Sequence, residues 1–250
     1  ALRRVKGKVL EEPPDASESD LHRVHDPGYV ETIRRYSESG VVMLDADTYL
    51  SRGTFAAALA AAGASIRAAE EAASGALPFA LVRPPGHHAG RRGRAMGAPT
   101  QGFCIFNNAA LLTARLLELG LRRVAVVDFD AHHGNGTQEV FYSDPRVLHI
   151  DFHEDPKTLY PGTGYPTDLG EGEGEGTKVN VILPPGSGDD AYALAIDEVA
   201  LPLLEEFKPE AIVFSAGFDA YRGDGLTHLR AGEATYARFG GLARDCLLYT

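Results

Sequence analysis

Residues 123–136 read Arg-Val-Ala-Val-Val-Asp-Phe-Asp-Ala-His-His-Gly-Asn-Gly, an apolar run that passes directly into acids and histidines. The first five residues are largely β-branched, which is typical of a strand buried in a parallel sheet. Open parallel sheets bind their ligands beyond the carboxyl ends of the strands. The stretch therefore predicts a buried strand that delivers Asp128, Asp130 and His132 to a site.

Strands and helices alternate along the rest of the chain. The predicted helices are 54–73, 107–119, 191–207 and 232–248, and the further predicted strands are 79–82, 147–152, 179–183 and 211–215. Gly120 stands where a helix usually ends. This alternation predicts a single α/β domain over residues 1–250 with a mainly parallel central sheet. The glycine-rich segment 171–176 is expected to be a solvated, flexible turn.

The composition is that of a globular protein and excludes several functions. Lys and Arg total 24 against 35 Asp and Glu, and the net charge of −11 disfavours direct nucleic-acid binding. Two cysteines, Cys104 and Cys246, are too few for a disulfide framework, so we expect a reducing, cytoplasmic location. No apolar run reaches the roughly 18 residues of a membrane span, so no membrane partner is expected. Nucleotide-binding and serine-hydrolase motifs are also missing from the sequence.

Acids and histidines follow three of the predicted strands, which points to one shared site. Asp130 and His132 are two residues apart, so an extended backbone puts both side chains on the same side. With Asp219 from another strand end they make a set of nitrogen and oxygen donors that suits catalytic zinc, with iron or cobalt as alternatives. Asp128 continues the same spacing and is expected to orient a histidine from behind.

The pair His87-His88 is the natural source of acid–base catalysis at such a site. A bound metal makes water acidic, and a histidine near its ordinary pKa accepts and returns protons. A catalytic histidine needs its second ring nitrogen held by a carboxylate or an amide. Asp128 and Asn135 are available for that task.

Five segments of the chain resemble the histone deacetylase family. They lie at residues 83–89, 102–108, 128–138, 160–164 and 215–220. The resemblance is closest to the class II-like branch and its bacterial amidohydrolase relatives, and it runs from about residue 24 to about residue 241. It implies the three-layer arginase–deacetylase α/β fold. It also implies zinc-dependent hydrolysis of an N-acyl amide, commonly acetyl-lysine in a protein or peptide, or an acetylpolyamine.

The resemblance assigns roles to individual residues. The implied metal ligands are Asp130, His132 and Asp219; the implied catalytic residues are His87, His88, Asp128 and Asn135; and the implied walls of the acyl-lysine tunnel are Gly102, Phe103 and Tyr160. A potassium ion behind the zinc is implied at Asp128, Asp130, His132, Asp151 and Phe152. His88 is the implied general base and acid, and His87 is its electrostatic neighbour. Asp151 departs from the family, because many relatives have Ser there.

The chain also departs from the family at its ends. Relatives carry a Gly-Gly-Tyr segment after the last helix, and its tyrosine hydrogen-bonds the oxyanion. The sequence stops at Thr250 before such a segment, and Tyr249 does not belong to that motif. The usual N-terminal His-Pro-Glu segment is absent as well. These departures lead us to expect a chain that is truncated at both ends.

Two other functions remain open at this point. An arginase-like ureohydrolase needs a second metal and an Asp-Ala-His-x-Asp motif, and here His133 and Asn135 follow His132. A catalytically impaired metal-binding or interaction protein is favoured by the missing tyrosine and opposed by the intact histidines and metal ligands. The sequence leaves the acyl length, the natural substrate and the oligomeric state undetermined.

Overall fold

A four-stranded parallel sheet forms the centre of the computed structural model, which describes residues 12–247. The strands are β5 (Val124–Asp128), β6 (Val147–Glu154), β7 (Lys178–Leu183) and β8 (Ala211–Ser215). They lie in the order β7-β6-β5-β8. In this register Asp128, the last residue of β5, has Asp151 on one side and Ser215 on the other. The carboxyl ends of β5 and β8 are therefore neighbours.

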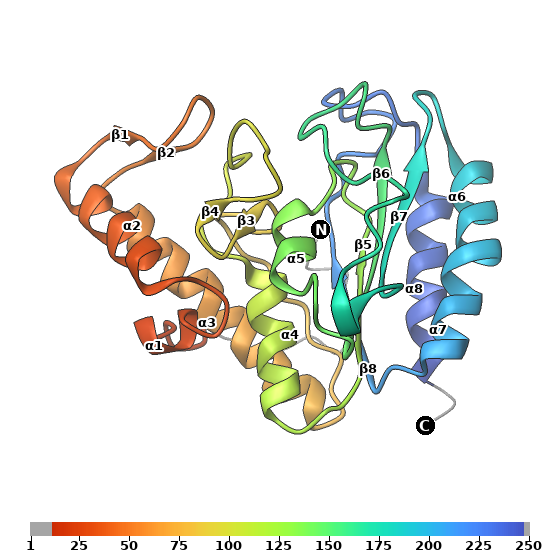
Figure 1. Ribbon diagram of the computed structural model, residues 1–250, viewed down its shortest axis with the longest axis horizontal. Helices are drawn as coiled ribbons and strands as arrows, with labels where there is room; N and C mark the ends of the chain where they lie inside the picture. Colours follow the sequence, from red (N-terminus) through yellow and green to blue (C-terminus); the bar gives the residue numbers. More distant parts are fainter. Residues whose placement is uncertain (1–11, 248–250) are drawn as a thin grey trace.

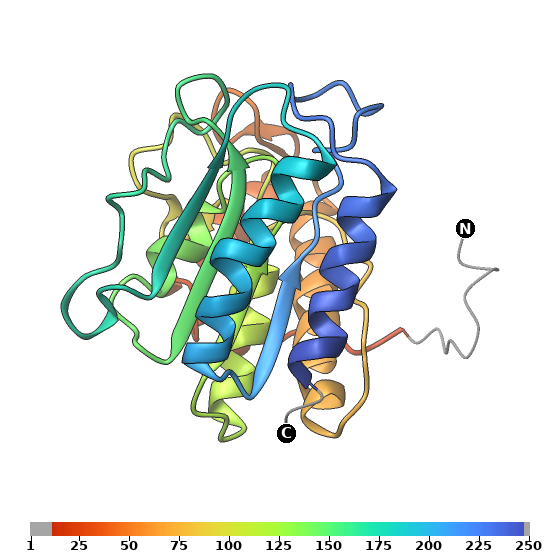
Figure 2. The ribbon, with the colours of Figure 1, turned by 90° about the vertical axis from the view of Figure 1, so that its right-hand side faces the viewer.

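Helices cover both faces of the sheet and make three layers (Figure 1). One face carries α2 (Pro27–Ser39), α3 (Thr54–Ala73) and α4 (Asn108–Glu118), and the other carries α6 (Asp189–Ala195), α7 (Leu201–Phe207) and α8 (Glu233–Leu247). Figure 2 looks onto the face that α6, α7 and α8 cover. A short π-helical stretch, Ile196–Ala200, joins α6 to α7.

The layers follow from the alternation of side chains along the buried strands. Val124 and Val126 of β5 pack in the hydrophobic core beneath α3 and α4. Ala125 and Val127, one residue along, point to the opposite face and pack in the core beneath α6 and α8. A strand buried on both faces needs apolar residues at every position, which the 124–127 run provides. The predicted α/β, three-layer arginase–deacetylase fold with a parallel sheet is confirmed.

Smaller elements lie around the sheet and its covering helices. They are α1 (Glu18–Leu21), α5 (Asn135–Val140), a 3₁₀ turn at Gly172–Gly174, and the short strands β1 (Val42–Met43), β2 (Tyr49–Leu50), β3 (Ala89–Gly90) and β4 (Gly93–Arg94). The pairs β1–β2 and β3–β4 are antiparallel hairpins. Both hairpins lie beside the sheet rather than in it (Figure 1).

The predicted helices at 54–73 and 107–119 are observed to within one residue of their expected limits, and local capping signals set the limits of the second. The helix over 54–73 is observed with those limits. Asn107 caps α4 by accepting a hydrogen bond from the Ala110 amide at 2.9 Å. Gly120 follows the helix with a φ of +103°, which only glycine adopts without strain.

One local prediction is wrong and another holds only in part. Residues 79–82 form no strand, since no strand among the described residues pairs with them, and Phe79 and Leu81 are 65% and 71% exposed. An apolar run therefore did not suffice to form a strand without a neighbouring strand. The 171–176 segment is the mostly exposed turn that was predicted, but it is held at two points. Glu171 accepts a hydrogen bond from the Ser143 hydroxyl at 2.8 Å, and Gly174 packs on the main chain of Ser143.

No helix within residues 12–247 is long and apolar enough to cross a membrane. Cys104 is a buried free thiol. The side chain of Cys246, and Tyr249 as a whole, lie outside the part of the chain whose placement the structure describes.

Candidate active site

The acids and histidines that follow the strands meet at the carboxyl edge of the sheet. Asp130 and His132 lie just past the end of β5, and Asp219 lies four residues past the end of β8. Main-chain hydrogen bonds hold the two connections together. The Phe129 amide donates to the Ser215 carbonyl at 3.2 Å, and the Ala131 amide donates to Asp219 Oδ1 at 2.9 Å.

Asp130, His132 and Asp219 point one donor atom each at a common centre. These three atoms all lie within 4.8 Å of one another. His132 Nδ1 is 3.0 Å from Asp130 Oδ1 and 2.6 Å from Asp219 Oδ2. Burial and the charge of Asp130 raise the pKa of Asp219, a repulsion that a cation between the carboxylates relieves. Two carboxylates and one imidazole fit a catalytic zinc ion that keeps an open position.

His87 is held as a cation by the acids below it. Its Nδ1 lies 3.0 Å from Asp128 Oδ2, and its Nε2 lies 3.9 Å from Asp130 Oδ2. Burial by itself lowers the pKa of His87, but the charges of Asp130 and Asp128 outweigh burial and raise it to about 10. Asp128 is fully buried, and its second oxygen accepts a hydrogen bond from the Asp130 amide at 3.1 Å.

His88 has the opposite electrostatic environment although it is the next residue. Burial, reinforced by the charge of His87, lowers the pKa of His88 well below its ordinary value. Its Nδ1 lies 2.7 Å from Asn135 Oδ1, and the Asn135 amide nitrogen donates to the Ala95 carbonyl at 2.9 Å. Because Asn135 presents an oxygen to Nδ1, that nitrogen carries the proton and His88 Nε2 is free to accept one. The neighbouring histidines thus divide into a neutral base and a cation.

Glycines let the main chain come close to these side chains. A Cβ at Gly134 would lie 2.7 Å from Asp128 Oδ2, and a Cβ at Gly136 would lie 2.5 Å from the main chain of His88. Both distances are shorter than real Cβ contacts. The Gly-Asn-Gly sequence therefore places Asn135 against His88.

The three expected wall residues lie around His88. Gly102 adopts a φ of +53°, and a Cβ there would be 2.4 Å from His88 Cδ2. The ring of Tyr160 packs edge-on against His88 at 5.0 Å between centroids. Phe103 follows Gly102 with a φ of +65° and is 61% exposed.

A second group of possible metal ligands lies deeper, and the sequence predicted only two of its three residues. Asp128, His149 and Asp151 offer donor atoms within 4.8 Å of one another, and all three are buried. His149 was not predicted, and among the described residues neither of its ring nitrogens has a hydrogen-bond partner. The two-residue spacing of His149, Asp151 and His153 is the sequence signal from which it could have been found. The side chain of Phe152 points the other way, into the core.

His133 belongs to neither group of metal-ligand candidates. Its Nδ1 is 2.8 Å from the Thr163 hydroxyl, and its Nε2 is 3.0 Å from Gln138 Oε1. Burial lowers the pKa of His133 to about 3. Its part is structural, because both ring nitrogens are taken by neutral partners.

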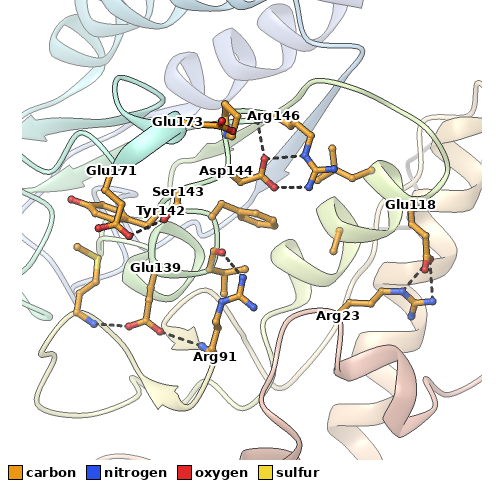
Figure 3. Close-up of a pocket in the computed structure, with 16 residues that line it drawn as sticks. Arg23, Arg91, Glu118, Glu139, Tyr142, Ser143, Asp144, Arg146, Glu171 and Glu173 are labelled. Atoms are coloured by element: carbon orange, nitrogen blue, oxygen red, sulfur yellow. Dashed lines mark hydrogen bonds and ion pairs between the residues drawn. The ribbon is translucent and has the colours of Figure 1, made fainter.

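A large groove on the described part of the chain lies away from this chemistry. It has a volume of about 1210 Å³ and is lined by α4, α5 and the loops at 141–146 and 171–173. Figure 3 shows that its basic side chains already have partners: Arg146 pairs with Asp144, and Arg23 pairs with Glu118. None of the residues in the two metal-ligand groups lines the groove. The site at the strand ends is therefore separate from it.

Comparison with known proteins adds relatives of named activity. The chain is 47% identical to a probable deacetylase of Archaeoglobus fulgidus, over 92% of this chain and 62% of the relative. It is 36% identical to acetylpolyamine amidohydrolase 1 of Pseudomonas aeruginosa, over 96% of this chain and 78% of that protein. The crystal structure of the HDA15 HD domain superposes with a TM-score of 0.89 at 38% identity, covering 94% of this chain and 66% of the other.

These matches extend along nearly all of this chain but not along all of its relatives. The chain spans 62% of the length of the archaeal protein. The model of the family described as the histone deacetylase domain matches residues 2–247, which include every side chain of the site above. The chain therefore belongs to the histone deacetylase domain family.

Proposed function

We propose that this chain is a single catalytic domain that hydrolyses N-acyl amines, removing acetyl or related acyl groups from lysine side chains or polyamines. The observation that carries the proposal is the neutral His88 placed beside the cationic His87 and the three convergent donors Asp130, His132 and Asp219. Neutral base, cation and metal ligands are the parts that metal-assisted amide hydrolysis requires.

Asp130, His132 and Asp219 would hold zinc, with iron or cobalt as alternatives of similar ligand preference. When bound, the metal supplies Lewis-acid chemistry, which polarises the acyl carbonyl and lowers the pKa of water. The absence of thiolates from the ligand set favours an open catalytic site over a closed structural one.

His88 moves the protons in the proposed reaction. Its Nε2 accepts a proton from the water whose oxygen attacks the acyl carbon. The same nitrogen then gives that proton to the amine nitrogen as the carbon–nitrogen bond breaks, and a carboxylic acid and an amine leave. Asn135 keeps the other proton on Nδ1 throughout, because it offers only an oxygen there.

His87 and Asp128 do not take part in the proton transfer; their role is electrostatic. The protonated His87 lies between Asp128 and Asp130 and stabilises negative charge that develops on the acyl oxygen. It also keeps His88 neutral, because a neighbouring cation disfavours a second one.

The substrate is proposed to enter along Gly102, Phe103 and Tyr160, which flank His88. The net charge of −11 suits a cationic amine at the mouth. The name of the Pseudomonas aeruginosa relative supports acetylpolyamines, and the family supports acetyl-lysine. A cytoplasmic location, inferred from cysteine content, belongs to the same proposal, as does the absence of nucleic-acid and membrane partners.

A structural potassium ion is part of the proposal. The buried carboxylates of Asp128 and Asp151 are oxygen donors of the kind that hard cations prefer. His149 is the one donor of this group that does not suit potassium, since imidazole is a ligand of transition metals. Stability measured in potassium and in sodium at equal ionic strength tests the ion.

His88→Ala tests the role of the base. Its turnover of acetyl-lysine peptides and acetylpolyamines, assayed in parallel with zinc, should fall by about 10²–10⁴-fold, the usual contribution of general acid–base catalysis. Zinc content should stay at the wild-type level. His22→Ala is the matched control, because His22 is an exposed histidine outside the site. Loss of zinc from His88→Ala would refute the assignment, and a wild-type chain inactive on both substrates would refute the proposed reaction.

A further inference from the structure

Gly102 and Phe103 both adopt the left-handed backbone conformation, which glycine tolerates but phenylalanine does not favour. Their φ angles are +53° and +65°. The left-handed conformation costs a non-glycine residue roughly 1–2 kcal/mol, so Phe103 needs outside contacts to hold it there. Within the segment, the Cys104 amide donates to the Gln101 carbonyl at 3.0 Å. This hydrogen bond leaves the amides of Gln101 and Phe103, on either side of Gly102, to be bonded by other groups.

The loop between β1 and β2 holds those two amides. The Gln101 amide donates to Asp45 Oδ2 at 2.8 Å, and the Phe103 amide donates to the Thr48 hydroxyl at 3.0 Å. Thr48 is buried. The other oxygen of Asp45 accepts from the Thr48 amide at 2.9 Å. The Asp45 carboxylate therefore bonds the Thr48 amide in its own loop and the Gln101 amide in the facing segment.

The contacts of this segment reach the proposed base. A Cβ at Gly102 would lie 2.4 Å from His88 Cδ2 and 3.0 Å from Tyr160 Cε1, so the main chain at 102 touches both rings. The Tyr160 hydroxyl donates to the Thr100 carbonyl at 2.8 Å, which ties the opposite wall to the same segment. A shift of residues 100–103 would thus move both walls relative to His88.

We propose that Asp45 and Thr48 are positioning residues that hold the Gly102–Phe103 wall against His88 and Tyr160. The inference rests on the proposed function, since the wall matters only if an acyl-lysine or acylated polyamine stem passes along it. Neither residue touches the reacting atoms. They act through the Gln101 and Phe103 amides, and they set the width of the channel for the stem.

Thr48→Val removes the hydrogen-bond acceptor while keeping the shape of the side chain, and Thr48→Ser restores the acceptor. Asp45→Asn keeps the size of Asp45 but loses one acceptor oxygen. Thr32→Val is the matched control, because Thr32 bonds only the Gly28 carbonyl on the exposed face of α2. Two readouts apply to all four variants: amide hydrogen exchange at Phe103 by NMR, and kinetics on two substrates.

Exchange of the Phe103 amide should speed up at least tenfold in Thr48→Val and stay near wild type in Thr48→Ser and Thr32→Val. The value of kcat/KM for an acetyl-lysine peptide should fall about tenfold in Thr48→Val and Asp45→Asn, the usual effect of losing one hydrogen bond. Hydrolysis of a small aryl acetate, which has no stem to fill the channel, should be unchanged. Thr48→Ser should restore the peptide rate.

Unchanged exchange and unchanged kinetics in Thr48→Val would overturn the inference. An equal loss on both substrates would overturn it as well, because general destabilisation affects every substrate. If the wild-type chain hydrolyses neither substrate, the proposed function fails, and the exchange readout still decides whether the loop holds the Phe103 amide.

Discussion

Replacing Gly217 by Ala tests the metal site without relying on catalysis. A Cβ at this position would lie 2.0 Å from Asp130 Oδ2, about 1.4 Å closer than the 3.4 Å at which ordinary contact begins. The Asp130 carboxylate has to retreat by that amount, while metal–ligand distances tolerate only about 0.2 Å. Asp130 should therefore be lost as a ligand, and His132 and Asp219 should remain.

The expected cost is a zinc affinity at least about 100-fold weaker, or about 2.7 kcal/mol, because even indirect misplacement of a ligand costs about 10–100-fold. Calorimetric titration of the metal-free protein with zinc measures it. The added Cβ would also lie 2.4 Å from Asp130 Cγ and 2.6 Å from Asp130 Cβ, so the main chain at Asp130 has to shift as well. Circular dichroism and thermal unfolding of Gly217→Ala therefore verify that the variant is folded before zinc is added. Gly240→Ala is the control, since nothing lies within 4 Å of its Cβ position. A zinc Kd within threefold of wild type in Gly217→Ala would refute the placement of Asp130 as a ligand.

Two further predictions concern the wall and a buried histidine. Gly102→Ala and Gly97→Ala share the strain of a positive φ, +53° and +77°, but only the Cβ at 102 meets His88. Turnover should fall about 100-fold in the first variant and stay near wild type in the second, and equal turnover would contradict the geometry. Burial lowers the pKa of His25 to about 4, and its Nε2 accepts from the Asn107 amide. The unfolded chain binds this proton near pH 6.5, so stability should fall by about 1.4 kcal/mol per pH unit from pH 6.5 towards pH 4. Urea unfolding of His25→Gln should show a shallower slope over that range, and an unchanged slope would exclude His25 as the cause.

The strands and their polar ends were predictable because the signals are local. The run at 123–127 forms β5 to within one residue, and the helix at 54–73 has the predicted limits. Asp130 and His132 share a side of the chain through the two-residue period of an extended backbone. The carboxyl ends of parallel strands lie at the same edge of a sheet, so Asp219, which follows another strand, could be expected near Asp130 and His132.

Predictions failed, or held only in part, where a segment depends on a partner elsewhere in the chain. Residues 79–82 have strand-forming residues, but no described strand lies beside them. The 171–176 segment has the composition of a free loop, yet Gly174 fits closely against the main chain of Ser143. Composition reports what a segment favours in isolation, and packing decides what it does.

The sequence by itself determined the fold class and the donor types at the site, because periodicity and strand-end chemistry are properties of short segments. Only the tertiary structure brought His149 and Asp151 of β6 together with Asp128 of β5, and joined Asp45 to the Gln101 amide across 56 residues of chain. The opposite pKa shifts of His87 and His88 were likewise a tertiary result. They arise from burial and from the charges of Asp128 and Asp130 beside His87, which the His-His pair by itself does not encode.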